Sequence, residues 1–121
     1  STKPLVYLWI NMANKYINKS INLTTTDLTT LYTVPAETVA IIKAIQGFND
    51  TASSVSVTLS YTDASASATY AFGYVTSTSI EQFELLTSDL LVLEESDVLK
   101  IQATAANQIT GVVSILEQDR T

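Results

Sequence analysis

The sequence predicts an all-β protein: an antiparallel β-sandwich or jelly-roll of about eight strands with an N-terminal arm. Two observations favour this fold class. Apolar and hydroxyl residues alternate through short segments, and clusters of turn-forming residues separate these segments at intervals of about 8–12 residues. In addition, no stretch shows the amphipathic pattern of about 10–15 residues that strand–helix–strand units need.

The 121 residues are enough for one domain with its own core. We divide the chain into an arm or strand plus linker, residues 1–28, and a β-sandwich, residues 29–121. The arm contains an apolar run at residues 5–10, which as a strand would need cover on both faces. One face would carry Leu5, Tyr7 and Trp9, and the other Val6, Leu8 and Ile10.

Eight segments after the arm have the composition of strands. The first is rich in Thr and ends at Pro35, which cannot donate a ladder hydrogen bond. In the second we expect Val39, Ile41 and Ile45 on one face and Ile42 on the other. The third alternates apolar and hydroxyl residues, the pattern of a half-buried strand.

The fourth segment has aromatic residues at alternate positions, and the other four are short apolar runs bounded by Ser, Thr, Asp or Glu. Hydroxyl residues are abundant, with 18 Thr and 13 Ser, and they suit the polar face of a sheet. The eight predicted strands are residues 29–34, 38–48, 55–62, 68–75, 80–86, 90–93, 98–105 and 110–117.

The formal net charge is −6, from 12 acidic and 6 basic residues. Phosphate contacts need clustered Lys or Arg, so we expect no nucleic-acid partner. The apolar runs are far shorter than the ~20 residues that span a bilayer, so we expect no membrane partner. Residues 1–26 carry +3, from Lys3, Lys15 and Lys19, and the remainder carries −9. This polarity favours docking of the arm on an acidic neighbour such as an identical subunit; alternatively, the lysines only solubilise an apolar segment.

Because the sequence has no His and no Cys, the common nucleophile–base pairs and zinc sites cannot be built. The acidic cluster Glu94, Glu95 and Asp97 lacks the spacing of a calcium loop, and we interpret it as a solvated turn. Glu81 and Glu84 have the residue type of a glycosidase carboxylate pair, but the sequence cannot show the separation of the two carboxylates that this chemistry needs. We therefore expect no enzymatic activity, catalytic residue, cofactor or metal site.

Two groups of aromatic residues are candidates for binding. Tyr70, Phe72 and Tyr74 are expected on one face of a strand. Core filling is the default interpretation for such residues, and a surface on which a sugar ring stacks is the alternative. The second group is Tyr7, Trp9 and Tyr16. Within it, Trp9 lies outside the regular succession of strands and turns, which favours a role as the anchor of a subunit contact.

A further indication comes from six segments: residues 31–36, 39–45, 49–59, 83–86, 91–103 and 112–117. Together they resemble the small virion structural proteins of tailed bacteriophages, over about three quarters of the chain. Such proteins usually have Gly in their turns, whereas this chain has Glu37 and Ser96.

The resemblance implies a capsid decoration (cement) protein that self-associates as a homotrimer and binds the major capsid protein of the assembled head. Binding only the assembled shell would stabilise it by mass action. The implied location is the virion, on the capsid surface, after synthesis in the host cytoplasm. The alternatives are a tail, fibre or head–tail adaptor subunit, and a carbohydrate- or receptor-binding β-module.

We assign the subunit or capsid contact to the arm. Removal of residues 1–26 should therefore abolish particle binding and leave a folded domain. The assigned residues are Leu5, Tyr7, Trp9, Ile10, Lys15 and Lys19.

Overall fold

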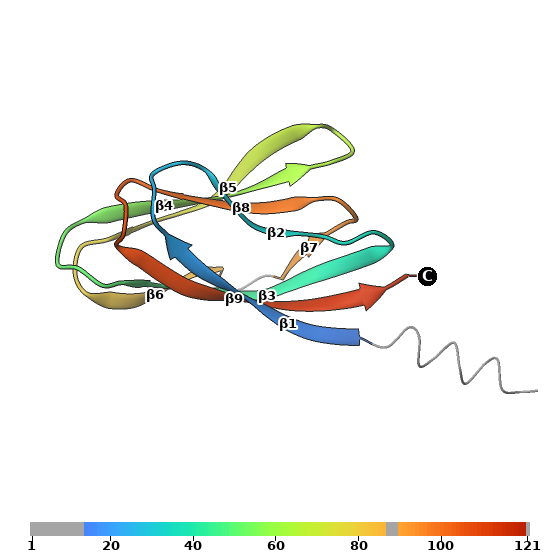
Figure 1. The fold of residues 1–121 in the computed structure, drawn as a ribbon, viewed down its shortest axis with the longest axis horizontal. Coiled ribbons are helices and arrows are strands. Elements are labelled where there is room, and N and C mark those ends of the chain that lie inside the picture. The colour runs from blue at the N-terminus through green and yellow to red at the C-terminus, as the bar shows by residue number, and fades with distance from the viewer. Residues whose placement is uncertain (1–13, 87–89, 121) are drawn as a thin grey trace, which may run out of the picture.

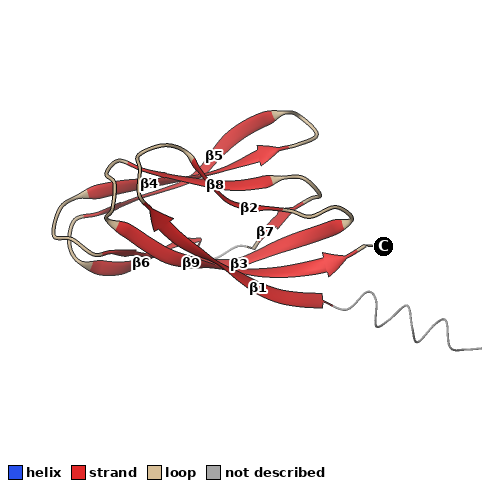
Figure 2. Ribbon diagram, viewed as in Figure 1, coloured by secondary structure: helices blue, strands red, loops and turns tan. Residues whose placement is uncertain are grey.

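A computed structural model describes residues 14–86 and 90–120 of the chain. The described part consists of strands and connecting loops (Figure 2). Among these residues there is no helix that could span a membrane. The strands are β1 (Asn14–Leu23), β2 (Thr29–Thr33), β3 (Thr38–Asn49), β4 (Val55–Asp63), β5 (Ala68–Ser77), β6 (Glu81–Leu86), β7 (Leu91–Leu93), β8 (Val98–Ala103) and β9 (Ile109–Asp119).

The strands form two antiparallel sheets that pack face to face (Figure 1). One sheet has the order β1-β9-β3-β6, with β7 also paired to β3, and the other has the order β2-β8-β4-β5. The first and last strands are neighbours, and the chain passes repeatedly from one sheet to the other, as in a jelly-roll. The predicted all-β sandwich is confirmed, and the eight predicted strands correspond to β2–β9.

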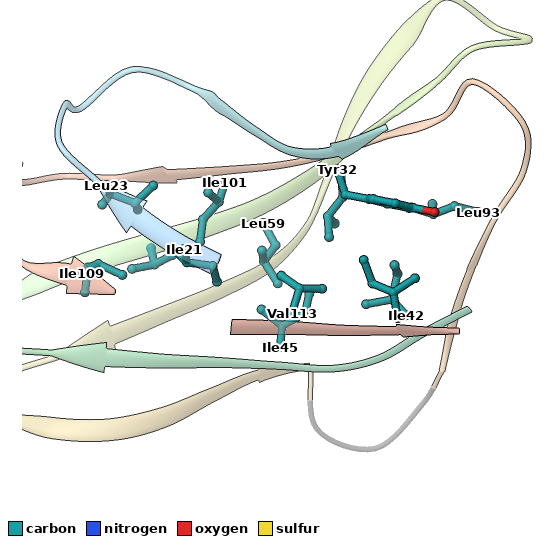
Figure 3. Close-up of a cluster of buried hydrophobic side chains, with 14 of the residues drawn as sticks. Ile21, Leu23, Tyr32, Ile42, Ile45, Leu59, Leu93, Ile101, Ile109 and Val113 are labelled. Atoms are coloured by element: carbon teal, nitrogen blue, oxygen red, sulfur yellow. The ribbon is translucent and has the colours of Figure 1, made fainter. Parts of the chain in front are cut away.

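The core lies between the inner faces of the two sheets (Figure 3). Ile42, Ile45 and Val113 from the β1-β9-β3-β6 sheet are 0% exposed, as are Leu59 and Ile101 from the other sheet. Full burial of a side chain of this size contributes about 1.5–3 kcal/mol. This layer holds the two sheets together, so the outer faces and the sheet edges are the surfaces left for function.

The first strand corrects the expected boundary at residue 28. β1 pairs with β9 along its whole length, from Asn14 opposite Gln118 to Leu23 opposite Ile109. Leu23 is only 1% exposed and belongs to the core. The sandwich therefore includes Asn14–Leu23, and removal of residues 1–26 would delete one of its strands. The polar residues that resembled a linker are tolerated because β1 is an edge strand, open to solvent on one side.

In β3, the predicted division of faces is wrong. Ile42 lies opposite Ile115 and Ala44 lies opposite Ser114, so Lys43 is an extra residue in a β-bulge. The bulge reverses the alternation of faces. Ile42 and Ile45 therefore both point into the core, whereas Ile41 lies on the outer face.

Four non-Gly residues of the described turns adopt the backbone conformation that favours Gly, and Glu37 and Ser96 are two of them. Glu37 has a φ of 56° and Ser96 a φ of 71°. A residue with a side chain costs about 1–2 kcal/mol in this region. The turns are held by hydrogen bonds, from Glu37 N to Glu95 Oε2 at 3.2 Å and from Ser96 N to Val34 O at 3.0 Å. This chain thus adopts the left-handed conformation at both turns without Gly.

Candidate interaction surfaces

The outer face of the β2-β8-β4-β5 sheet is covered by hydroxyl groups. Ser56 and Thr62 of β4 alternate with core residues, as the sequence predicts. Their hydroxyls bond to those of the neighbouring strand, with 2.8 Å between Ser56 Oγ and Thr76 Oγ1 and 2.8 Å between Thr62 Oγ1 and Thr69 Oγ1. The polar groups of this face are thus partly satisfied by one another.

The outer face of the other sheet is different, because an apolar row crosses four of its strands. Tyr16 of β1 lies opposite Leu116 of β9, Leu116 opposite Ile41 of β3, and Ile41 opposite Val92 of β7. Tyr16 and Val92, at the two ends, are 74% and 58% exposed. We call these four residues the outer apolar row.

The outer apolar row was not predicted from the sequence, although the pattern of β3 indicates it. Directly after its first residue, Thr38, β3 has four consecutive apolar residues, Val39 to Ile42, and its two faces are both apolar. This pattern is typical of a strand that is covered on both faces. In the described structure the sandwich covers one face only.

The predicted contact residues are in two places. Leu5, Tyr7, Trp9 and Ile10 lie outside the described residues. The two lysines are on β1, where Lys15 is opposite Glu117 and Lys19 is opposite Val113, a core residue.

Lys15 and Lys19 are therefore on the core-facing side of an edge strand, and both are exposed. A charged residue in this position prevents another strand from pairing with the edge, because pairing would bury the charge. This geometry indicates that the lysines protect the β1 edge. Their assignment to a subunit or capsid contact stays a prediction.

The aromatic residues of β5 are not core, contrary to the default interpretation. Tyr70, Phe72 and Tyr74 are 49%, 37% and 70% exposed. They also do not share one face. Ala71 lies opposite Ser60 and Gly73 lies opposite Leu59, so Phe72 is an extra residue in a β-bulge and reverses the alternation of faces.

Tyr70 and Phe72 lie beside Tyr61 of β4, with ring centroids 5.8 Å and 6.1 Å from that of Tyr61. Tyr74 is opposite Thr58 on the hydroxyl face. Hydrogen bonds from Ser56 and Thr76 lower the pKa of the Tyr74 phenol. β5 therefore carries exposed aromatic groups on both of its faces.

The acidic cluster after β7 is a structural turn. Asp97 is only 7% exposed, so it is not the solvated residue that we expected. Its Oδ1 accepts a hydrogen bond from Ala64 N at 2.9 Å, and its Oδ2 accepts one from Glu94 N at 2.9 Å. The carboxylate thereby ties the β7–β8 turn to the β4–β5 turn. No group of three potential metal ligands occurs in residues 14–86 and 90–120.

A second buried polar contact joins the two sheets. The Tyr32 hydroxyl donates to Glu117 Oε2 at 2.6 Å. Burial of the Tyr32 phenol raises its pKa above the usual value, and the hydrogen bond to Glu117 and the negative charge of that group act in the same direction. The contact links β2 to β9, and Glu117 is half-buried.

Comparisons with known proteins place the fold. No protein-family model matches the sequence, and no curated protein matches it. Among solved structures, the chain is similar to one from the acid-stable capsid of Helicobacter pylori bacteriophage KHP30, with a TM-score of 0.56 and 11% identity over 90% of each chain. The jelly-roll-like fold is therefore shared with a phage capsid chain.

Other structures have the same fold. A chain of the disulfide-linked pili of Bacillus endospore appendages gives a TM-score of 0.52 and 11% identity, covering 90% of this chain and 88% of its own. Murine APRIL gives 0.51 and 8%, covering 84% of this chain and 98% of its own. At these identities the likeness shows the fold alone.

Proposed function

We propose that the chain is a virion structural protein, and more narrowly a capsid decoration protein that binds the assembled head and stabilises it. The observation that carries this proposal is the outer apolar row. It lies on a face that the sandwich leaves uncovered, and its two end residues, Tyr16 and Val92, are more than half exposed. Such a face indicates a site of contact with another protein.

The fold and the sequence support a virion as the place of this contact. The phage KHP30 capsid contains a chain of the same fold, and the sequence resembles small virion structural proteins. The partner is then the major capsid protein, and the location is the capsid surface after synthesis in the host cytoplasm. We propose no enzymatic activity and no cofactor.

Self-association adds to this mechanism. A homotrimer would present three copies of the outer apolar row to the shell. Linking several weak contacts raises the overall affinity by about 10²–10⁴. Since the arrangement of shell subunits exists only after assembly, the protein would bind the assembled head in preference to free subunits and stabilise it by mass action.

Labelling of particles tests the proposal directly. Gold-conjugated antibodies against this chain should label the whole head in electron micrographs of the virions that carry it. Quantitative mass spectrometry should find copies in a fixed ratio to the major capsid subunit. Label at one vertex or along the tail would instead indicate the tail, fibre or adaptor alternative, and unlabelled particles would rule out a virion role.

A pair of variants tests the contact surface. Val92→Lys places a charge in the outer apolar row, and we expect it to weaken binding to the assembled shell by about tenfold or more. Thr58→Lys, on the hydroxyl face, is the matched control and should bind as the wild type does. Equal binding by all three proteins would exclude the outer apolar row as the shell contact.

The carbohydrate-binding alternative has one observation in its favour. Tyr61, Tyr70 and Phe72 form a cluster of rings, two of which are more than a third exposed. A sugar ring stacking there would change tyrosine fluorescence. A glycan array without signal, together with unchanged fluorescence in the presence of sugars, would remove this alternative.

A further inference from the structure

The open edges of the two sheets differ in charge and length. An edge strand exposes backbone N–H and C=O groups that can pair with another chain, and proteins protect such edges with charges or short strands. β1 carries Lys15 and Lys19, β6 carries Glu81 and Glu84, and β2 has only five residues with an irregular register. These three edge strands are thus protected.

β5 is long and uncharged, and apart from the bulge at Phe72 it lacks this protection. It has ten residues, none of them charged, and within the described part of the chain it pairs only with β4. Nearly all of its residues are exposed or half-buried. Tyr70 and Phe72 lie on the core-facing side of β5, and Tyr74 lies on its outer side. A strand added to this edge would therefore contact aromatic groups on both of its faces.

We infer that the β5 edge binds residues 5–10 of a second copy of this chain as an added antiparallel or parallel strand. The run Leu-Val-Tyr-Leu-Trp-Ile is uncharged and apolar on both faces. A strand of this kind needs cover on both faces. Pairing with β5 would satisfy its backbone groups and give each face an aromatic neighbour, which is strand addition as seen in peptide recognition.

The geometry requires that the two partners belong to different copies. Residue 10 is four residues before Asn14, where β1 begins, so it lies within about 14 Å of Asn14 even in a fully extended chain. β1 and β5 are at diagonally opposite edges, because β1 neighbours β2, whereas β5 neighbours β6. β1 and β5 are separated by three strand spacings of about 4.8 Å within the sheets and by about 10 Å between the sheets. The direct distance through the core is therefore about 17 Å, and the path around the surface is longer.

This contact is head-to-tail, since it joins different parts of the two copies. Such contacts close into rings or continue as filaments, according to the rotation between neighbours. A closed ring of three copies agrees with the homotrimer in the proposed function. The inference itself does not rest on a virion role, because the pairing of residues 5–10 with β5 is a property of this chain alone.

The only Trp of the chain, Trp9, allows a direct test. A protein that lacks residues 1–13 keeps every described strand and contains no Trp. A synthetic peptide of residues 1–13 is titrated into this protein, and its Trp emission is recorded. We expect saturable binding with a blue shift, because Trp9 would become buried against β5.

A matched pair of substitutions identifies the surface. Tyr74→Lys places a charge on β5, and Asn18→Lys places the same charge on β1; both residues are exposed, and Asn18 is not part of the outer apolar row. In the shortened protein, Tyr74→Lys should weaken peptide binding by about tenfold or more and Asn18→Lys should leave it unchanged. Urea unfolding of both variants checks that the sandwich is intact. Equal peptide binding by both would exclude β5.

The mass of the full chain in solution completes the test. Light scattering should find an oligomer for the full chain and for Asn18→Lys, but a monomer for Tyr74→Lys and for the protein without residues 1–13. A monomeric full chain would overturn the inference, as would an oligomer that persists without residues 1–13. That second result would indicate pairing between two β5 strands. None of these outcomes depends on shell binding, which Val92→Lys tests separately.

Discussion

Asp97 provides the sharpest test of how the loops of the sandwich are held. Its carboxylate accepts hydrogen bonds from Ala64 N and Glu94 N, both at 2.9 Å, while its own backbone O accepts one from Val34 N at 2.9 Å. The residue thus joins the loops after β2, β4 and β7. In Asp97→Asn, the side chain keeps one oxygen and directs an NH₂ group at a backbone donor.

The expected loss follows from these two bonds. A hydrogen bond to a charged group contributes about 1.5–3 kcal/mol, but water can reach part of this turn and replaces some of that energy. We expect Asp97→Asn to lower the free energy of unfolding by about 2–4 kcal/mol, a large part of the about 5–15 kcal/mol typical of a domain. With a urea m-value of about 2 kcal/mol/M, the midpoint should fall by about 1–2 M.

Urea unfolding followed by circular dichroism measures this change. The matched control is Glu94→Gln, which alters an exposed carboxylate of the same turn and leaves the backbone donor in place. Its midpoint should stay within about 0.3 M of the wild type. If Asp97→Asn also stays within this range, the two hydrogen bonds do not hold the loops as we have reasoned.

Three further predictions follow from the packing. In urea unfolding, Gly111→Ala should destabilise the fold by more than about 2 kcal/mol, because the added Cβ would lie 2.1 Å from a backbone oxygen. Gly73→Ala is the control: the atoms nearest to its added Cβ are at 3.5 Å, so it should change stability by less than about 1 kcal/mol. The raised pKa of Tyr32 means that the folded state holds the phenol proton more tightly than the unfolded state does. The stability that this group contributes is therefore fully present below about pH 10 and is lost as the pH rises above it. Melting curves across this range should show a smaller alkaline loss of stability for Tyr32→Phe than for the wild type. Removal of residues 1–13 should leave a cooperative unfolding transition, but removal of residues 1–26 should abolish it because β1 is lost; a folded protein without residues 1–26 would contradict the role of β1 in the core.

Much of the fold was predictable because its signals are local. The alternation from Val55 to Thr62 and the turn residues around it depend only on neighbours in the chain. The place of β1 was not predictable in this way. Its polar residues resemble a linker, and only the pairing with β9 shows that Leu23 completes the core.

The candidate site was predictable only in part. The exclusion of His and Cys chemistry follows from composition, and the apolar character of residues 5–10 is visible in the sequence. The outer apolar row was not, because its residues come from four strands that are distant in sequence and meet only through the register of the sheet.

By itself, the sequence determined the fold class, eight of the nine described strands and the residue types that limit the chemistry, since these follow from local periodicity and composition. The tertiary structure decided which face each side chain occupies. Single-residue bulges at Lys43 and Phe72 reverse the alternation, and these bulges exist only relative to a partner strand. For that reason the exposed aromatic groups of β5 and the uncovered face of β3 emerge only when the strands are paired.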